Sequence, residues 1–388
     1  IRDCRKRWCF CGLVPTFLGL LLTPLALQAQ LPSAQLTSVY PPGGQPGQQV
    51  EVTIAGKDLD EVAQLQFSHP GITATRKMRE PGSFETDPQP VANVFVVTVA
   101  GNVPAGNHDV RAIGKYGITN PRAFVVDPLP AVIEEEPNDI PGEGQEIVQP
   151  TSLFGWLEQG TDVDYYQLAV TSGERVIVRC QARSIDSRMD PILVVFDSDG
   201  RQLANSRGTR EREPLLDFTS RVNGMVTLKV YDAVYRNGPD FFYRLSVGAL
   251  PYIDFVFPPA GQAGGNRSFT VFGRNLPGGQ PAGIRVGGIE LQKLVVNIPL
   301  PGGNAQYNVP SLVPTDSISS GLDVVAYQVK TPQGSSNPVL VGITDLPPVL
   351  EVEPNNSPEK AQPLELPADV AGRFLGERDQ DWYFFEAI

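Results

Sequence analysis

The sequence predicts an all-β protein made of tandem β-sandwich domains. Among its 388 residues, 38 are glycine and 37 are proline, which is high for a helical protein and suits short strands joined by turns. Alternating apolar runs of strand length recur between Gly, Pro and Asn residues. A long repeat also runs through the chain, so that Glu134 in the first half corresponds to Glu351 in the second. At about 100–200 residues per domain, a chain of this length holds two to four domains.

The charge distribution argues against nucleic acid as a partner. The formal net charge is −12, and residues 1–29 are basic, so residues 30–388 together carry about −15. Such a surface repels phosphate backbones and favours cations or basic partners. We therefore expect no nucleic-acid binding.

Residues 1–29 have the pattern of an export signal. A basic start precedes an apolar run from Cys11 to about Leu27, and the small Ala29 offers a cleavage point. Prolines interrupt the run and no stop-transfer flank follows, so a membrane anchor is the weaker alternative. We expect a secreted, periplasmic or cell-surface protein with no stable membrane span after signal removal. Removal leaves Cys180 as the single cysteine, and its alternating strand predicts a buried, inert thiol.

One constant shift, which carries Glu134 onto Glu351, aligns the two halves of the chain and is called the repeat spacing below. It places residues 40–42 (YPP) on 257–259 (FPP), 117–121 (GITNP) on 334–338 (GSSNP), and 134–139 (EEEPND) on 351–356 (EVEPNN). Missing such a repeat would lead to the wrong fold for the whole chain. A constant offset over this span predicts a duplicated unit of two domains.

The first domain of each unit opens with a turn and an alternating strand. The two openings are "PPGGQPGQQVEVTIAGKDL" and "PPAGQAGGNRSFTVFGRNL", and further strand-like runs follow in the first copy at residues 94–99 and 124–126. Each opening has a proline-glycine turn, an alternating strand, then a glycine and a leucine, and this order resembles the immunoglobulin-like IPT/TIG family. The resemblance implies immunoglobulin-like domains over residues 34–126 and 250–344.

The second domain of each unit carries another series of strands. In the first copy they are expected at residues 165–170, 175–182, 192–196, 225–231 and 241–247. The order of "EEEPND", "GWLEQGTDVDYYQLAV", "GERVIVRC", "DPILVVFDSDGRQLA", "GMVTLKVYD" and "FFYRLSVG" resembles a bacterial pre-peptidase C-terminal domain. The resemblance implies a β-sandwich over residues 131–249 of an exported protein. The second copy, residues 348–388, is truncated, and we expect it to be poorly packed or to borrow partners.

The acidic stretch in each unit is a candidate metal site. Alternate side chains of an extended segment share a face, so Glu134 and Glu136 should point together while Glu135 opposes them. The second copy has Val352 at the position of Glu135, so only the shared face stays acidic. Ca²⁺ prefers hard oxygen ligands of the kind that Glu, Asp and Asn supply.

The pre-peptidase resemblance also implies calcium, because its collagen-binding members hold Ca²⁺ through this acidic linker and through aspartates that precede an aromatic residue. Carried onto this sequence, the resemblance gives the candidate ligands Glu134, Glu136, Asn138, Asp139, Asp162, Asp164, Glu351, Glu353, Asn355, Asp379 and Asp381. Asn356 replaces the acid of the first copy. The alternative is that Asn138 and Asp139 cap a turn and that the acids are solvated.

Little in the sequence supports catalysis. The two histidines, His69 and His108, lie outside any G-x-S-x-G or H-E-x-x-H pattern and are expected at the surface. The aromatic residues Tyr231, Tyr235, Phe241, Phe242 and Tyr243 are expected mainly in the core, and the alternative is a binding platform on a sheet face. We expect a non-catalytic exported protein that acts in extracellular or cell-surface binding, adhesion or domain spacing, with an extracellular protein or polysaccharide as partner. The alternative is an accessory, substrate-binding region of a secreted peptidase or other hydrolase whose catalytic domain lies outside this chain.

Overall fold

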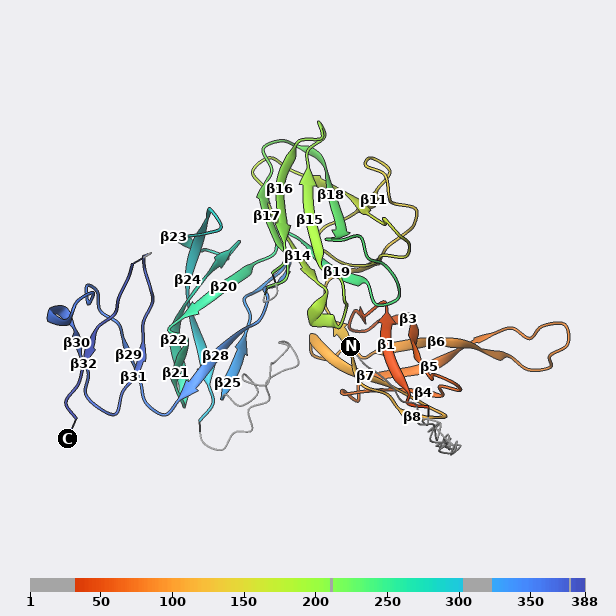
Figure 1. The fold of residues 1–388 in the computed structure, drawn as a ribbon, viewed down its shortest axis with the longest axis horizontal. Helices are drawn as coiled ribbons and strands as arrows, with labels where there is room; N and C mark the ends of the chain where they lie inside the picture. Colours follow the sequence, from red (N-terminus) through yellow and green to blue (C-terminus); the bar gives the residue numbers. More distant parts are fainter. Residues whose placement is uncertain (1–31, 210–211, 303–322, 377, 388) are drawn as a thin grey trace, which may run out of the picture. The chain divides into compact units, whose positions relative to one another are not determined.

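The protein is built almost entirely of β-strands arranged as tandem β-sandwiches (Figure 1), which confirms the predicted fold class. The computed structural model describes residues 32–209, 212–302, 323–376 and 378–387. The expected export signal at residues 1–29 lies outside this range. Within the range, helical structure amounts to short 3-10 turns, and no helix is long and apolar enough to cross a membrane.

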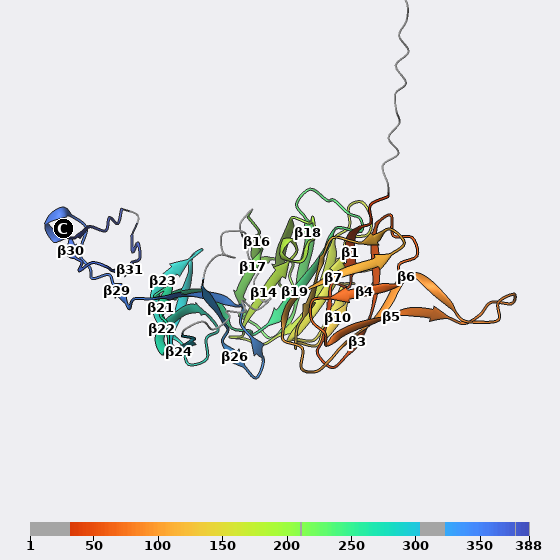
Figure 2. The ribbon, with the colours of Figure 1, turned by 90° about the horizontal axis from the view of Figure 1, so that it is seen from below.

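The first sandwich spans residues 35–126. Its strands are β1 (Gln35–Tyr40), β2 (Gly43–Gly44), β3 (Gln49–Lys57), β4 (Gln64–Phe67), β5 (Ile72–Arg79), β6 (Gln89–Val99), β7 (Gly106–Gly114), β8 (Gly117–Ile118) and β9 (Arg122–Val126). They form one sheet in the order β1-β3-β6-β5 and another in the order β2-β9-β7-β4, with β8 beside β7. Alternation along β3 buries Val52 and Ile54 against Phe95 of β6 and Phe124 of β9. The β5–β6 hairpin extends beyond the two sheets (Figure 1 and Figure 2).

His108 is buried, so the prediction that both histidines lie at the surface is wrong. Along β7 every second side chain faces the core, and His108 occupies the inward position that precedes Val110 and Ala112. Its Nε2 lies 2.9 Å from the carbonyl oxygen of Pro104, and its ring meets that of half-buried His69 edge-on at 5.6 Å. Burial lowers the pKa of His108, which favours the neutral imidazole at neutral pH.

The second sandwich spans residues 131–248. Its elements are β10 (Ala131–Ile133), β11 (Gln145–Ile147), β12 (Thr151–Trp156), β13 (Asp164–Val170), β14 (Arg175–Gln181), the 3-10 turn η1 (Arg183–Ile185), β15 (Pro191–Phe196), β16 (Gln202–Arg207), β17 (Leu215–Thr219), β18 (Gly224–Asp232) and β19 (Phe242–Gly248). The sheet orders are β10-β12-β19-β14-β17 and β11-β13-β18-β15-β16. The core between them includes Leu153, Leu168, Leu228 and Leu245. Cys180 is buried in the same core, as predicted, and burial raises the pKa of its thiol.

The third sandwich spans residues 252–344. Its strands are β20 (Tyr252–Phe257), β21 (Ala260–Gln262), β22 (Gly265–Arg274), β23 (Gln280–Val286), β24 (Ile289–Leu300), β25 (Val324–Tyr327), β26 (Lys330–Thr331), β27 (Gly334–Ser335) and β28 (Val339–Thr344). One sheet has the order β20-β22-β24-β23, and the facing sheet has the order β21-β28-β25. Val271, Phe269 and Val341 lie in the core between them.

The last described segment contains short elements only. They are β29 (Pro348–Leu350), the 3-10 turn η3 (Pro358–Lys360), β30 (Gln362–Pro363), β31 (Asp369–Ala371) and β32 (Tyr383–Phe384). β29 pairs with β31 and β30 pairs with β32, each as a two-stranded sheet. Many apolar side chains here are exposed, including Phe374 and Phe385.

Strand registers recur at the repeat spacing in several places. β10 aligns Ala131 with Ser152 of β12, and β29 aligns their repeat equivalents, Pro348 with Asp369 of β31. The offset is lost in the middle of the third sandwich. In the first sandwich, Val50 of β3 pairs with Val97 of β6. Arg267 of β22 is the repeat equivalent of Val50, but it pairs with Ile298, which is not the repeat equivalent of Val97. The observed recurrence is therefore strongest in the acidic linkers and the strands beside them.

A glycine in β12 allows a close approach of two strands in the second sandwich. Gly155 lies opposite Tyr243 of β19, and a Cβ atom at Gly155 would stand 2.2 Å from Cζ of that ring. We predict that Gly155→Ala lowers the free energy of unfolding by about 1–3 kcal/mol, because the buried ring must move. Thermal or urea unfolding of the purified chain measures the change.

Gly160→Ala is the matched control in the same sandwich. The nearest atom to a Cβ at Gly160 is 3.8 Å away, which is an ordinary van der Waals contact. Its unfolding free energy should stay within about 0.5 kcal/mol of the parent. Equal stability of the two variants would contradict the packing described at Gly155.

Candidate metal centre

The carboxylate of Glu134 is held in place by three hydrogen-bond donors. Glu134 directly follows β10, and its backbone N–H still donates to Phe154 of β12 at 2.9 Å. Its Oε2 accepts the backbone N–H of Trp156 at 2.7 Å, while Oε1 accepts the hydroxyl of Tyr166 at 2.6 Å and the amide of Asn138 at 2.9 Å. The hydroxyl of Tyr243 lies 3.4 Å from the same oxygen. The side chain is therefore fixed by strands from both sheets.

Asp164 is fully buried at the start of β13. Its Oδ2 accepts a hydrogen bond from Tyr243, whose hydroxyl is 2.6 Å from that of Tyr166. Within the described residues, its Oδ1 has no hydrogen-bond partner. Asn138 is also fully buried, and no described group donates to its side-chain Oδ1. Two buried oxygens thus lack the donors that such groups nearly always have.

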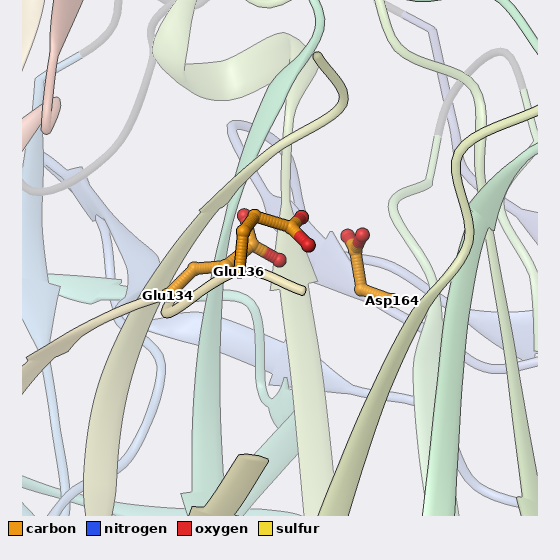
Figure 3. A group of neighbouring side chains, drawn as sticks. All are labelled: Glu134, Glu136 and Asp164. Carbon is orange, nitrogen blue, oxygen red and sulfur yellow. The ribbon is translucent and has the colours of Figure 1, made fainter. Parts of the chain in front are cut away.

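Glu136 completes a group of three carboxylates (Figure 3). Its Oε2 accepts the backbone N–H of Asn138 at 2.9 Å, which turns the linker after the cis peptide bond that joins Glu136 to Pro137. Glu134, Glu136 and Asp164 each offer one oxygen, and these oxygens lie within 4.8 Å of one another. Figure 3 shows the three carboxylates turned toward one another. Glu134 and Glu136 share a face, as the alternation of an extended segment predicts.

Asp139 and Asp162 lie beside this group rather than in it. Oδ2 of Asp162 accepts the backbone N–H of Glu158 at 2.6 Å, which closes the loop before β13. Partial burial and a hydrogen bond with Asp139 raise the pKa of Asp162 to about 6. The structure therefore places these two candidates next to each other at the edge of the acidic cluster.

The three carboxylates are electrostatically costly in the absence of a cation. Burial is the main cause of the raised pKa of Glu134. Burial and the charge of Glu134 raise the pKa of Asp164 well above its usual value. Partial burial and the charges of Glu134 and Asp162 raise the pKa of Glu136 to about 7. Within the described residues, Glu134, Glu136 and Asp164 form no ion pair with a basic side chain. These residues fit a divalent cation, because they offer clustered oxygen ligands and two buried oxygens without donors.

A second acidic cluster has the same arrangement around Glu351. Its Oε2 accepts the backbone N–H of Arg373 at 2.7 Å, and its Oε1 accepts the side-chain amide of Asn355 and the hydroxyl of Tyr383, each at 3.2 Å. The backbone N–H of Asn355 donates to Glu353 at 3.0 Å. The group of carboxylates within 4.8 Å consists of Glu351, Glu353 and Asp381.

The unpartnered oxygens recur in this second cluster. They are Oδ1 of Asn355, which is fully buried, and Oδ1 of Asp381. Asp379 and Asn356 lie at the edge, where Asp379 accepts the backbone N–H of Leu375 and Asn356 that of Gln380. Both clusters therefore leave the same two kinds of oxygen without donors.

The two clusters differ in their surroundings. Although partial burial acts in the opposite direction, hydrogen bonds from Arg373 and Asn355 hold the pKa of Glu351 below its usual value. Burial, with the hydrogen bond and charge of Glu351, raises the pKa of Asp381 to about 6. No described residue takes the place that Tyr243 has beside Asp164 in the first cluster. The second cluster is therefore more open than the first.

Sequence reasoning missed the tyrosine hydroxyls that enter the first cluster. Tyr166 could have been found, because it directly follows the aspartate pattern and recurs as Tyr383 at the repeat spacing. Tyr243 could not, because it is separated from Asp164 by 79 positions and reaches it only through the pairing of β19 with β12. It was expected simply as a core aromatic residue, and it is indeed fully buried.

Comparisons with known proteins find solved structures that match parts of this chain. No family model matches the chain, and no curated protein matches it. The solved pre-peptidase C-terminal domain of a Bacillus anthracis collagenase is 24% identical, covering 28% of this chain and 99% of that chain with a TM-score of 0.24. The SGBP-B protein of a Bacteroides ovatus mixed-linkage glucan utilization locus is 9% identical, and the match covers 57% of this chain and 76% of that chain with a TM-score of 0.20. The fibronectin(III)-like modules of Clostridium thermocellum CbhA are 12% identical, and the match covers 54% of this chain and 90% of that chain with a TM-score of 0.17. The first and last are β-sandwich domains, as this chain is.

The raised pKa values of Glu134 and Asp164 predict how stability depends on pH without metal. A carboxyl whose pKa is higher in the folded state stabilises the fold fully at low pH, and this contribution is lost as pH rises through the folded-state pKa. We predict that in chelator the free energy of unfolding is larger at acidic pH than at neutral pH, because both carboxyl groups have raised pKa values in the folded state. Urea unfolding at each pH measures this.

Two variants isolate the origin of that pH dependence. Asp164→Asn keeps the size of the side chain but cannot ionise, so its stability should change less with pH than that of the parent. Asp199→Asn alters an exposed acid in the turn between β15 and β16 and should keep the parental slope. A parental slope in Asp164→Asn would show that the buried carboxyl is not its cause.

Proposed function

We propose that this is a non-catalytic exported protein whose β-sandwiches space or present binding surfaces outside the cell, with Ca²⁺ held in the two acidic clusters. The observation that carries the proposal is a repeated arrangement. In each cluster three carboxylates converge, and a buried asparagine oxygen and an aspartate oxygen are left without donors. A bound cation would satisfy both oxygens and offset the clustered negative charge.

The donor set favours Ca²⁺ over zinc and copper. Glu134, Glu136, Asp164 and the side chain of Asn138 provide oxygen atoms only, and Asp139 and Asp162 lie close by. Ca²⁺ takes six to eight such ligands, including water, in flexible geometry. Zinc and copper prefer nitrogen or sulfur ligands, which this cluster does not offer. When bound, the ion would supply positive charge and cross-link the linker to β13.

The first cluster lies beside a contact between two sandwiches, which supports a spacing role. Glu134 holds the backbone of Trp156, whose ring packs against that of Tyr40 with 5.3 Å between centroids. The hydroxyl of Tyr40 also donates to the carbonyl of Phe154 at 3.2 Å. Tyr40 belongs to the first sandwich, so a cation that fixes Glu134 would also steady this contact.

The second cluster also lies beside a contact with the preceding sandwich, and here the contact is a cation–π interaction rather than a contact between two aromatic rings. Glu351 holds the backbone of Arg373, whose guanidinium lies 4.5 Å from the ring centroid of Phe257 and 5.6 Å from that of Phe272. Cation–π contacts of this kind contribute about 0.5–1 kcal/mol at exposed sites. Phe257 and Arg373 are the repeat equivalents of Tyr40 and Trp156. The proposed cation would thus act at equivalent places in both halves.

The reactive side chains support a non-catalytic role. Burial raises the pKa of the Cys180 thiol, which disfavours the nucleophilic thiolate. His108 is turned into the core of the first sandwich, where its Nε2 meets a backbone carbonyl and its ring meets that of His69. These groups therefore have structural surroundings rather than those of a nucleophile and its base.

A stacked tyrosine pair with one exposed member supports an extracellular protein or polysaccharide as partner. Tyr231 on β18 stacks on Tyr235 with 5.5 Å between ring centroids, and Tyr235 and Val234 are exposed. The ammonium group of Lys229 lies 4.7 Å from the centroid of Tyr231. Such a rigid amphipathic surface suits stacking against a sugar ring or an apolar peptide side chain.

Calcium should raise the thermal stability of the second sandwich. At a free Ca²⁺ concentration of 100 times the dissociation constant, one site adds about 2.7 kcal/mol to the free energy of unfolding. We predict that melting in millimolar CaCl₂ occurs at higher temperature than melting in chelator, and that Glu134→Gln removes most of this difference. Differential scanning calorimetry of both proteins in both buffers measures the effect.

Glu146→Gln is the control for that experiment. Glu146 is an exposed acid of β11 in the same sandwich, and its replacement should leave the calcium effect intact. Melting curves of the parent that superimpose in calcium and in chelator would rule out the proposed site.

A further inference from the structure

The two histidines of the chain lie side by side at one end of the first sandwich. His69 belongs to the turn of residues 68–71 between β4 and β5, and His108 lies near the start of β7. Their rings meet edge-on with 5.6 Å between centroids, where His108 is 5% exposed and His69 is half-buried. The acidic clusters lie elsewhere in the chain, so the proposed function leaves this pair without a role.

His69 accepts a hydrogen bond that requires an unprotonated ring nitrogen. Its Nδ1 accepts the backbone N–H of Gly71 at 3.0 Å within the turn. The backbone N–H of Ile72 also donates to the carbonyl oxygen of His69 at 3.0 Å. In a protonated imidazole both ring nitrogens are donors. Protonation therefore removes the bond from Gly71 and sets two N–H groups against each other.

The surroundings of His108 favour its neutral form. Its Nε2 donates to the carbonyl oxygen of Pro104 at 2.9 Å, which ties the ring to the loop of residues 100–105. Burial is the main cause that lowers the pKa of His108, and a charge on His69 adds to the decrease. The bond to Pro104 and the charge of Asp109 act in the opposite direction.

Few charged groups face the ring of His108. Asp109 follows it in β7 and is exposed, and His108 itself pairs with Phe124 of the neighbouring strand β9. Residues 100–105 (AGNVPA) carry no charged side chain, and His69 is the one titratable residue of 68–71 (SHPG). Among the described residues, a proton on His108 therefore finds no buried acid to offset its charge.

The turn of residues 68–71 packs directly on the loop of residues 100–105. The backbone N–H of Ala100 donates to the carbonyl oxygen of Gly71 at 2.9 Å. A Cβ atom at Gly71 would stand 2.9 Å from Cγ2 of Val103, which is buried. Because His69 is part of the turn and His108 is bonded to the loop, the charge of the pair acts on this contact.

We propose that His69 and His108 form an acid-sensitive clasp, which holds the turn of residues 68–71 on the loop of residues 100–105 at neutral pH and releases it at mildly acidic pH. The clasp uses residues of the first sandwich alone. It does not depend on a cation in either acidic cluster.

The contact should weaken as pH falls. An exposed imidazole has a pKa of about 6.5, so at pH 5.5 an opened clasp takes up a proton that buried His108 resists. A group with a lowered folded-state pKa stabilises the fold fully above its ordinary pKa, and this contribution is lost as pH falls through the folded-state pKa. Mutual repulsion and the lost bond from Gly71 act in the same direction once both rings are charged.

The test is hydrogen–deuterium exchange of the whole chain at pH 7.5 and pH 5.5, with rates corrected for the intrinsic effect of pH. Exchange is read in peptides that cover residues 66–74 and 98–108, so titration in the acidic clusters does not enter. We expect the corrected rates to be about three- to tenfold higher at pH 5.5, since one linked proton changes an opening equilibrium by up to about tenfold per pH unit. Equal corrected rates at the two pH values would overturn the proposal.

A double variant isolates the histidines as the cause. In His69→Asn the side-chain oxygen can replace Nδ1 as acceptor, and in His108→Gln the side-chain amide can replace Nε2 as donor, while neither new side chain titrates. The variant with both changes should lose the difference between the two pH values. Asp87→Asn removes an exposed acid from the loop between β5 and β6 and should keep it. A parental pH dependence in the double variant would contradict the clasp.

A spectroscopic readout covers the case in which the double variant does not fold. Nuclear magnetic resonance of the parent labelled with ¹⁵N at histidine gives imidazole signals for two residues. The signal of His108 should show a proton on Nε2 and should titrate at lower pH than a free imidazole. Titration of His108 at or above the pH of a free imidazole would overturn the proposal.

Discussion

A buried carboxylate without a basic partner is the constraint on which the second sandwich depends. Asp164 begins β13 with no exposed surface, and Glu134 enters the same interior from the linker after β10. Tyr166 and Tyr243 surround both with hydroxyl groups that come from different sheets. Hydrogen bonds reduce the cost of burying two acids, but they leave the negative charge in place. In the proposed account, a bound cation would offset that cost and link the linker to the strands that meet there.

The two acidic clusters separate what the linker determines from what the surrounding strands determine. In both, the Glu-x-Glu-x-Asn sequence produces the same turn. The backbone N–H of the asparagine donates to the second glutamate, and its side-chain amide donates to the first. Burial differs, because residues 224–248 cover the first cluster and no described strand covers the second. The linker therefore brings the acids and the asparagine together by local geometry, and the covering strands decide how strongly the acids are desolvated.

Local patterns predicted the fold class and the shared face of Glu134 and Glu136, because strand alternation is a property of neighbouring residues. They failed at His108, which was expected at the surface because it lies near the start of a strand. In β7 its side chain already takes an inward position and is buried. They also missed the hydroxyl of Tyr243, which reaches Asp164 only after distant strands have paired. The unpartnered oxygen of Asn138 was equally out of reach, since a missing donor is visible only in three dimensions.

The central claim is that the two acidic clusters hold Ca²⁺, and a crystal structure of the protein grown in millimolar CaCl₂ tests it most directly. Anomalous diffraction data identify calcium by its scattering. The account predicts an anomalous peak among Glu134, Glu136 and Asp164, with Oδ1 of Asn138 at a ligand distance of roughly 2.3–2.6 Å. Density for water alone at these oxygens, with no anomalous peak in either cluster, would contradict it.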